Sequence, residues 1–486
     1  MTTLAAIVRP DRQARPAVPG PIAALVAGML VGWSIPVSAQ PLVTASPAQA
    51  QAQALVIASP AQAVAEALNR SPALRGAGAA RAAVRGDALA APLRPNPDAS
   101  IVVENFGGMG GRGNYREGRA IETTLGLSQR IELGGKRGAR IGLAGRATEL
   151  AGLDYEAARL DLARDVVTAL ADAEVAFRTI AVERDRARLA AETLRIARGR
   201  VDAGKEPLLQ ARRAEVTLAT ATVAVERATR DADIALRNLA VLVGVPQLEL
   251  APRRSWFDDI GPAPSLPLPA DPLDRVAPNP DILRLEAAIT QQRANIALQR
   301  ANAIPDVTLQ GYVRRFEEGR ETAFVAGASI PLPFNDRNQA GIARAQAELL
   351  RAEAEADRGR LAIATALGTA ERRAGMAWRT VQTLRRSALP AAEQAARLAL
   401  GGFTEGKFTF LEVLDAQRAL ADTRVQHVDA LREFHARRAE AERLRGREAG
   451  LQVPGREAGS QYPGLEAGSQ YPGREAGSQA LSGHRQ

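Results

Sequence analysis

The chain has 486 residues, enough for two or three ordinary domains, and it contains no cysteine. Disulfides, thiolate metal sites and a lipid-anchored N-terminal cysteine are therefore excluded. The net charge is +9, but arginine and acidic residues interleave along stretches such as 183–200, which is typical of solvated helix faces. Hydrophobic residues make up 46% of the chain and aromatic residues only 4%, so alanine dominates the apolar content and favours closely packed helices.

Residues 1–39 have the pattern of an export signal. Three arginines (Arg9, Arg12 and Arg15) form a basic region, and the apolar stretch 21–33 is too short to span a bilayer comfortably. Small residues at 37–39 precede the expected cleavage point. A short membrane anchor is the alternative. We expect residues 40–58 to form a flexible segment after the signal.

Most of the remaining chain is a weak duplication. Its landmarks are Pro72 and Pro280 at a spacing of 208, Pro97 and Pro305 also at 208, Ser128 and Ser329 at 201, and Gly204 and Gly406 at 202. The first structural repeat is expected over 59–250 and the second over 272–446, with a proline-rich connector at 251–271. The nine-residue repeats that begin at Gly446 indicate a disordered tail over 447–486.

Both copies predict the same elements in the same order. The first opens with a helix capped by Ser59 and Pro60 and stopped by Pro95 and Pro97. The second opens with a helix over 281–302 that ends before Pro305. Alternating apolar and polar residues then predict strands around 100–106 and 121–131 in the first copy and over 306–314 and 322–330 in the second.

Each copy continues into a very long helix. The stretch 139–199 lacks proline and has helical periodicity, so it predicts a helix of ~90 Å. Its counterpart over 339–401 contains Pro390, which should kink it. Each long helix reaches a Gly-Lys turn and reverses into another helix, over 207–243 and 409–445. No later stretch of the sequence is apolar enough to predict a transmembrane helix.

The four strands have the length that a membrane crossing requires, but four strands cannot close a barrel. Three chains would supply twelve strands, and the long alanine-rich helices could line a second, helical cylinder. We therefore predict a mainly α fold with a transmembrane β-barrel that several chains close together, with four strands per chain, and that is continued by an α-helical barrel.

Over residues 59–446 this pattern resembles the TolC family of outer-membrane efflux channels. The resemblance rests on the duplicated element order, on the stretch 330–354 ("IPLPFNDRNQAGIARAQAELLRAEA") and on 414–420 ("LDAQRAL"). The stretch 127–141 ("LSQRIELGGKRGARI") looks most like the outer-membrane components of cobalt-zinc-cadmium and copper-silver efflux systems.

The resemblance implies a homotrimer in outer-membrane lipid, with its helical part in the periplasm, that docks a periplasmic adaptor and an inner-membrane pump. Such a protein is a passive channel without a cofactor or catalytic residues. Drug efflux or type I secretion is the alternative substrate class, and a periplasmic coiled-coil adaptor or an arginine-rich nucleic-acid binder are the other classes. The export signal and the interleaved acidic charge argue against nucleic-acid binding.

The segment 104–118 contains glycines with the spacing of a dinucleotide-binding turn. Because another alternating strand follows where a helix would be needed, we interpret the segment as an extracellular hairpin loop. Its glycines are Gly107, Gly108, Gly110, Gly111 and Gly113. The first copy has seven residues more than the second between strands, which marks this loop as an insertion.

Two strand-to-helix turns are predicted to join the barrel to the helices. The first contains Gly134, Gly135 and Lys136, and the second contains Pro331, Pro333, Asn335 and Asp336. Paired glycines and an Asn-Asp pair both suit residues that adopt unusual backbone angles.

The resemblance places adaptor docking at the tips of the two helical hairpins. The residues that match are Arg200, Gly204 and Lys205 in the first tip and Phe403, Gly406 and Lys407 in the second. Gly402 stands where the resemblance would place a second arginine, so the second tip departs from the family pattern at this position. A plain helix–turn–helix with a glycine cap is the alternative for both tips.

The family also gates its channel with inward-pointing acidic residues, for which Asp202, Glu393 and Glu405 are the candidates. The histidines do not predict a metal site. His427 and His435 share one helical face but lie about 12 Å apart along it, so they cannot chelate one ion without other ligands. Metal selectivity would therefore reside in the pump.

Overall fold

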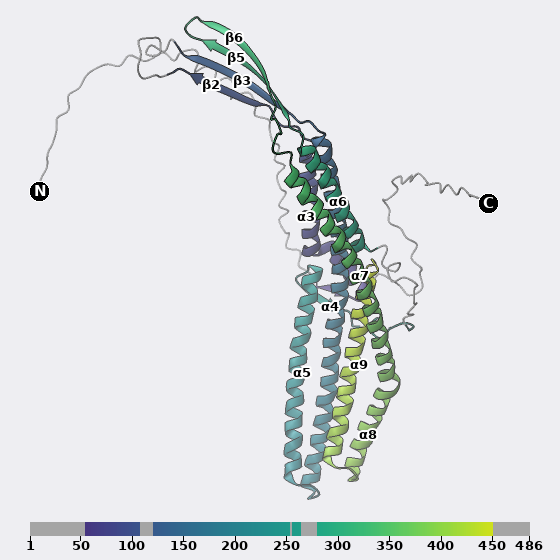
Figure 1. The fold of residues 1–486 in the computed structure, drawn as a ribbon. Helices are drawn as coiled ribbons and strands as arrows, with labels where there is room; N and C mark the ends of the chain where they lie inside the picture. Colours follow the sequence, from purple (N-terminus) through teal and green to yellow (C-terminus); the bar gives the residue numbers. More distant parts are fainter. Residues whose placement is uncertain (1–53, 107–119, 253–254, 264–278, 451–486) are drawn as a thin grey trace, which may run out of the picture. The chain divides into compact units, whose positions relative to one another are not determined.

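The computed structural model describes residues 54–106, 120–252, 255–263 and 279–450. β1 (Leu55–Ile57) precedes the first copy, which contains α2 (Pro60–Arg70), α3 (Pro72–Ala90), β2 (Asp98–Glu104), β3 (Glu122–Ile131), α4 (Lys136–Asp202), α5 (Leu208–Val243) and β4 (Leu248–Leu250). The second contains α6 (Pro280–Asn302), β5 (Val307–Phe316), β6 (Glu321–Ser329), α7 (Gln339–Thr383), η3 (Leu384–Ala388), α8 (Leu389–Glu405) and α9 (Phe410–Leu444). The mainly helical fold and the duplicated element order are confirmed (Figure 1).

The four long strands form one antiparallel sheet in the order β2-β3-β5-β6. The two copies meet where β3 pairs with β5, in a register that places Leu125 opposite Val313 and Thr124 opposite Arg314. In this sheet β2 and β6 are the edges, and each has one strand neighbour.

The two faces of the sheet differ in chemistry. One face carries exposed apolar side chains, among them Leu125 at 42% and Phe324 at 84% exposure. The opposite face is largely polar, and on it Arg314 lies opposite Thr124, near the end of the sheet where β5 turns into β6. The Arg314 guanidinium contacts Glu104 at 3.4 Å and Glu122 at 3.1 Å, and it donates a hydrogen bond to the hydroxyl of Thr124. Apolar side chains face away from this ion-pair network, as the alternation in the sequence predicts.

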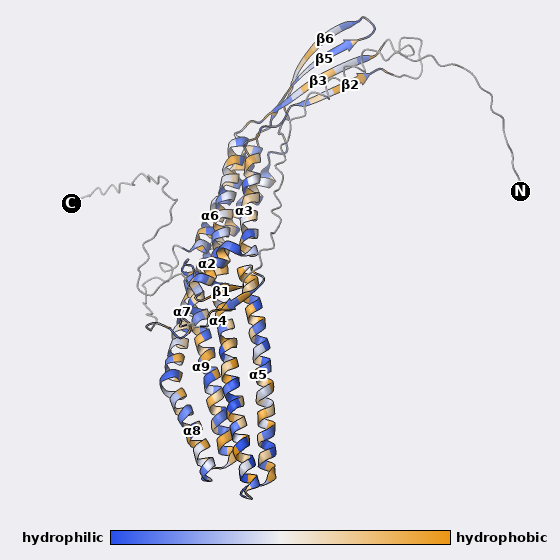
Figure 2. Cartoon of the chain, turned by 180° about the vertical axis from the view of Figure 1, so that it is seen from behind, coloured by the Kyte–Doolittle hydropathy of each residue, from blue (hydrophilic) through white to orange (hydrophobic). Residues whose placement is uncertain are grey.

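The long helices lie side by side in a layer. α4 packs against α5 and α9, and α9 packs against α7 and α8 (Figure 1). Hydrophobic and hydrophilic residues interleave along these helices (Figure 2). Alanine occupies much of the buried surface, as at Ala163, Ala171 and Ala197, each with no exposed area. The small side chains allow the close helix packing that the composition predicts.

Among the described residues, none of the helices combines the length and apolar character needed to cross a membrane. α4 has 67 residues, which corresponds to about 100 Å at 1.5 Å per residue.

Proline shapes the helices at two places. The single opening helix predicted for the first copy is wrong, because it is divided into α2 and α3 at Ser71, whose ψ of 127° is extended. Pro72 disfavours the helical conformation in the residue before it. The interruption at Pro390 is confirmed: the π-helical turn η3 lies directly before it, where the missing N–H of proline breaks the regular hydrogen-bond pattern.

Three segments outside the predicted helices and long strands are packed. Leu55–Ile57 forms a parallel strand pair with Leu248–Leu250, although 40–58 was predicted to be flexible. In the connector, Phe257 has no exposed surface. In the tail, Ala449 is also fully buried. These segments are short and irregular, so their burial depends on tertiary contacts that periodicity does not report.

Candidate functional site

The first strand-to-helix turn is built around two adjacent glycines. Gly134 and Gly135 both have positive φ, at 68° and 73°, and Gly135 caps the start of α4. A side chain at Gly134 would clash, because its Cβ would lie 2.7 Å from Ile304. The glycines therefore meet a conformational and a steric need.

Lys136 in this turn reaches the other copy. Its Nζ lies 2.6 Å from a carboxylate oxygen of Asp306, which precedes β5, and the same oxygen accepts a hydrogen bond from the Leu133 N–H at 3.2 Å. Burial would raise the pKa of Asp306, but the hydrogen bonds from Lys136 and Leu133 outweigh it and hold that pKa below its ordinary value. The sequence pattern identified Lys136 as a turn residue but did not indicate that Asp306 is its partner.

The second turn differs from the prediction in detail. The residue with positive φ is Asn338, at 57°, and neither Asn335 nor Asp336 has one. The Asp336 carboxylate instead accepts a hydrogen bond from the Asn338 N–H, which is an Asx-type turn. Pro331 and Pro333 follow the end of β6 at Ser329. The Asn338 amide donates to the Gln299 carbonyl, so this turn is held within its own copy.

At the first hairpin tip, Arg200 also reaches the other copy. Its Nη1 donates a hydrogen bond of 3.0 Å to the Phe403 carbonyl, and its Nη2 lies 3.2 Å from the Glu206 carboxylate. The guanidinium carbon lies 5.2 Å from the centre of the fully buried Phe403 ring. Arg200 therefore joins the two tips.

The packing of the second tip explains why glycine, and not arginine, occupies position 402. A Cβ at Gly402 would lie 2.3 Å from the Phe408 ring, so a longer side chain would displace that ring. The Gly402 carbonyl accepts the Lys407 N–H at 2.7 Å, which closes the turn. Gly406 follows with a φ of 81° and caps α8.

The outer surface of the tips is exposed and partly apolar. Gly204, with a φ of 70°, and Lys205 are exposed, as are Gly406 and Lys407. The apolar side chains exposed at the start of the returning helices are Leu208, Leu209, Phe408 and Leu411. Together they form a tip surface, defined here as these eight residues.

The three candidate gate acids have different surroundings. Glu393 lies 3.3 Å from Arg424, which also contacts Asp185 on α4 at 3.0 Å. Glu405 lies 2.6 Å from Lys407 in the same turn. Asp202, at the end of α4, is exposed. The structure does not bring the three acids together in one cluster. The glycine loop at 107–113 lies outside the described residues.

The histidines contact the connector and the helices. His435 is buried, and its Nε2 lies 2.9 Å from the Phe257 carbonyl while its ring stacks on the Phe257 ring. Burial lowers the pKa of His435 to about 4 and also lowers the pKa of His427. Across the parts of the chain that the structure describes, no His, Asp and Glu residues group to hold a metal ion.

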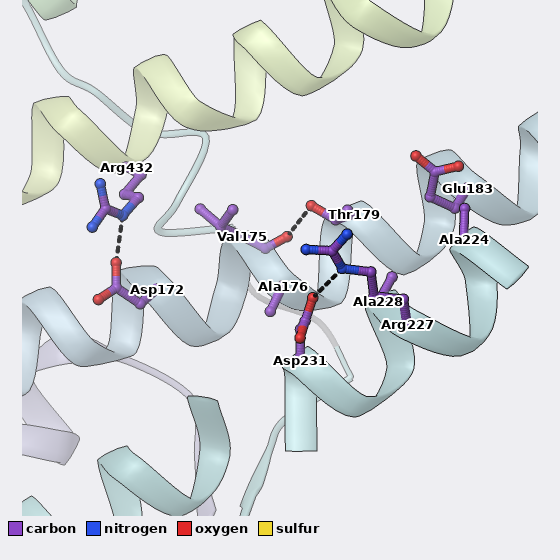
Figure 3. Close-up of a pocket in the computed structure, with 10 residues that line it drawn as sticks. All are labelled: Asp172, Val175, Ala176, Thr179, Glu183, Ala224, Arg227, Ala228, Asp231 and Arg432. Atoms are coloured by element: carbon purple, nitrogen blue, oxygen red, sulfur yellow. Dashed lines mark hydrogen bonds and ion pairs between the residues drawn. The ribbon is translucent and has the colours of Figure 1, made fainter. Parts of the chain in front are cut away.

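A groove between α4, α5 and α9 contains about 500 Å³ (Figure 3). Its charges are paired: Asp172 lies 2.5 Å from Arg432, and Asp231 lies 3.8 Å from Arg227. Because Asp172 and Asp231 already have cationic partners, these two carboxylates are poor metal ligands.

These features define a structural class before any comparison: a duplicated chain with an open amphipathic sheet, long helical hairpins and exposed tips. The family model for outer membrane efflux proteins matches residues 63–245 and 275–447. The chain therefore belongs to the outer membrane efflux protein family, and the outer membrane is its location.

Two relatives of known role are similar along much of their length. The cobalt-zinc-cadmium resistance protein CzcC of Cupriavidus metallidurans is 30% identical over 74% of this chain and 84% of its own. The nickel and cobalt resistance protein CnrC of the same organism is 31% identical over 60% of this chain and 67% of its own.

Solved structures share the fold. A crystal structure of CusC matches 80% of this chain and 92% of its own, with a TM-score of 0.67 and 18% identity. The outer-membrane channel OprN matches 81% of this chain and 90% of its own, with a TM-score of 0.67 and 22% identity.

Proposed function

We propose that this outer-membrane efflux protein is the passive, trimeric exit channel of a tripartite system that exports heavy-metal cations. The observation that carries the substrate class is the 30% identity to a cobalt-zinc-cadmium resistance protein over 84% of that protein's length.

The exposed edges of the chain support self-association. β2 and β6 are edge strands, and open edges cannot remain unpaired in lipid. Edge helix α5 carries a stripe of exposed apolar residues at helical spacing: Leu209, Val216, Val223, Ile234 and Val241. Pairing β6 with β2 of a neighbouring chain would extend the sheet, and three chains would give a closed barrel of twelve strands.

The duplication supplies a specific contact for this assembly. Within one chain, Lys136 of the first copy binds Asp306 of the second. By the spacing of 201 residues between the copies, Lys136 of the first copy corresponds to Arg337 of the second. By the spacing of 208 residues, Asp306 of the second copy corresponds to Asp98 of the first. Both Arg337 and Asp98 are exposed in the single chain. In the proposed trimer, Arg337 of one chain therefore binds Asp98 of the next.

Adaptor docking is proposed at the tip surface. Four exposed apolar side chains on it supply area that a partner could bury, and Gly204 and Gly406 leave room for a close approach. A side chain at Gly204 would project from the surface, because a Cβ there meets nothing within 4 Å. The gate proposal for Asp202, Glu393 and Glu405 rests on their position near the same end of the hairpins.

The substrate class is tested by deleting the gene and measuring resistance to zinc, cadmium, cobalt, copper and silver. We expect sensitivity to at least one of these ions, restored by the wild-type gene. Sensitivity to antibiotics or detergents with unchanged metal resistance would contradict the metal proposal and favour drug efflux.

A further inference from the structure

The first repeat of the C-terminal tail is seated in a groove beside the end of α9. The Arg447 N–H donates to the Glu442 carbonyl at 2.9 Å, and the Gly450 N–H donates to the Glu442 carboxylate at 3.3 Å. Gly446 and Gly450 have φ values of 72° and 82°. The backbone of this pentapeptide is therefore held in a conformation that glycine favours at both ends.

Two side chains of the pentapeptide fasten it to the helices. The Glu448 carboxylate lies 2.6 Å from the Arg159 guanidinium on α4. Ala449 has no exposed surface and belongs to the same buried cluster as Val167 and Ala439. Arg447, between them, is exposed.

A further constraint lies at Gly450. A Cβ there would lie 3.1 Å from both Pro60 and Val167, so a larger residue would press on the groove wall. A cavity of about 240 Å³ adjoins this point and is lined by Pro60, Val167, Gly450 and residues of α9. The groove therefore fits glutamate, alanine and glycine at positions 448–450, with little space for a larger residue at 450.

The same pentapeptide recurs three times in the tail, at 455–459, 464–468 and 473–477. Both glycines, the glutamate and the alanine are present in every copy. The second position is the one that varies, since Leu465 stands where the other copies have arginine. Three of the constant positions correspond to Glu448, Ala449 and Gly450, which contact the groove in the first copy. The fourth corresponds to Gly446, which has a positive φ, and the variable position corresponds to the exposed Arg447.

We propose that the groove is a docking site for this repeated pentapeptide, and that the later copies of the same chain are alternative occupants of it. For the second copy to enter, residues 446–454 must form a loop of nine residues. The entropic cost of closing such a loop grows only slowly with its length. The repeats thus give the bundle several interchangeable ligands for one groove.

The absence of cysteine from the chain makes disulfide trapping a direct test. Val167→Cys combined with Ala458→Cys places one thiol in the groove and one at the alanine of the second copy. Val167→Cys with Ala449→Cys is the positive control. Val167→Cys with Arg456→Cys is the matched control, because position 456 corresponds to the exposed Arg447.

The first copy is then displaced by Ala449→Asp in the full-length protein, and separately by the milder Glu448→Arg. We expect the intrachain 167–458 disulfide to increase at least threefold in both backgrounds, while the 167–456 pair does not change. An unchanged 167–458 yield in both backgrounds would overturn the proposal. So would a disulfide that joins two chains, because the proposal assigns the copies to their own chain.

Discussion

The two copies of the duplicated unit make different contacts at the strand-to-helix turn and at the hairpin tip. At the strand-to-helix turn and at the hairpin tip, the first copy extends a cationic side chain to the second: Lys136 reaches Asp306, and Arg200 reaches the Phe403 carbonyl. In the second copy, Asn338 bonds Gln299 of the same copy, and Phe408 covers Gly402. Both contacts between the copies are therefore made by cationic side chains of the first copy. The corresponding turn of the second copy has an exposed cation, Arg337.

This difference indicates which contacts between chains of the proposed trimer are strong and which are weak. At the turn, the charge pattern is kept in both copies, so the contact between chains should resemble the contact within a chain. At the tip, Gly402 replaces the arginine, so the contact between chains lacks the clamp that Arg200 provides. An opening movement would then separate chains at the tips while the turns remain joined.

The largest expected effect comes from Gly204→Asp at the exposed tip. The substitution adds charge where the adaptor is proposed to dock, and it places a side chain at a φ of 70°. We expect complete loss of metal resistance with trimers still present in outer membranes, and the same outcome for Gly406→Asp. Gly142→Asp, in open space on α4, is the control. Normal resistance in both tip variants would contradict docking at the tips.

Acid should weaken the attachment of the connector between the copies. His435 has a pKa of about 4 when folded and an ordinary value of 6.5, so the unfolded chain binds the proton more readily. Its surroundings include Arg438, Asp258 and Asp259. Stability contributed by neutral His435 is complete above pH 6.5 and falls by about 3 kcal/mol toward pH 4.

This pH dependence is measured by urea unfolding of wild type and His435→Phe between pH 7 and 4. We expect the wild type to lose more stability than the variant over this range. Parallel losses in the two proteins would show that His435 is not responsible.

Removal of the tip clamp by Arg200→Ala should loosen both tips. The variant loses a hydrogen bond from a charged group and a cation–π contact, together about 1–3 kcal/mol of local stability. Hydrogen exchange at residues 200–206 and 402–408 should become faster, with α6 unchanged as the internal control. Arg200→Lys should restore only part of the protection, because lysine lacks the planar fork. Unchanged hydrogen exchange at residues 402–408 would show that Arg200 does not stabilise the second tip.

The smallest expected effect is at the first turn. Lys136→Met removes a half-buried ion pair, which should cost about 1 kcal/mol. The thermal midpoint should fall slightly, and Asp306→Asn together with Lys136→Met should cost less than the sum of the single changes. Additive losses would mean that the two residues do not act as a pair.

Much of this fold was predictable because its signals are local. Helical periodicity over 139–199 and alternation over 121–131 survive in α4 and β3, and the paired landmarks revealed the duplication. Gly134, Gly135, Gly204 and Gly406 were recognisable because positive φ leaves a mark on residue choice.

What could not be predicted depends on partners far apart in sequence. Nothing beside Arg200 in the sequence indicates the Phe403 carbonyl, 203 residues away. The burial of Phe257 needs His435, and the burial of Ala449 needs α4. The repeated GREAG motif is visible in the sequence as a low-complexity repeat. The sequence does not show the groove in which its first copy packs, so this contact could not be predicted.

The contact between Arg337 and Asp98 of neighbouring chains gives the most direct test of the proposed assembly. Asp98→Cys and Arg337→Cys are introduced together in the full chain, and a short thiol-reactive cross-linker is added to outer membranes. Lys136→Cys with Asp306→Cys is the matched control, because the same pair lies within one chain. We predict covalent trimers for the first pair and monomers for the second. Exclusively monomeric products from both pairs would contradict the trimer that the duplication implies.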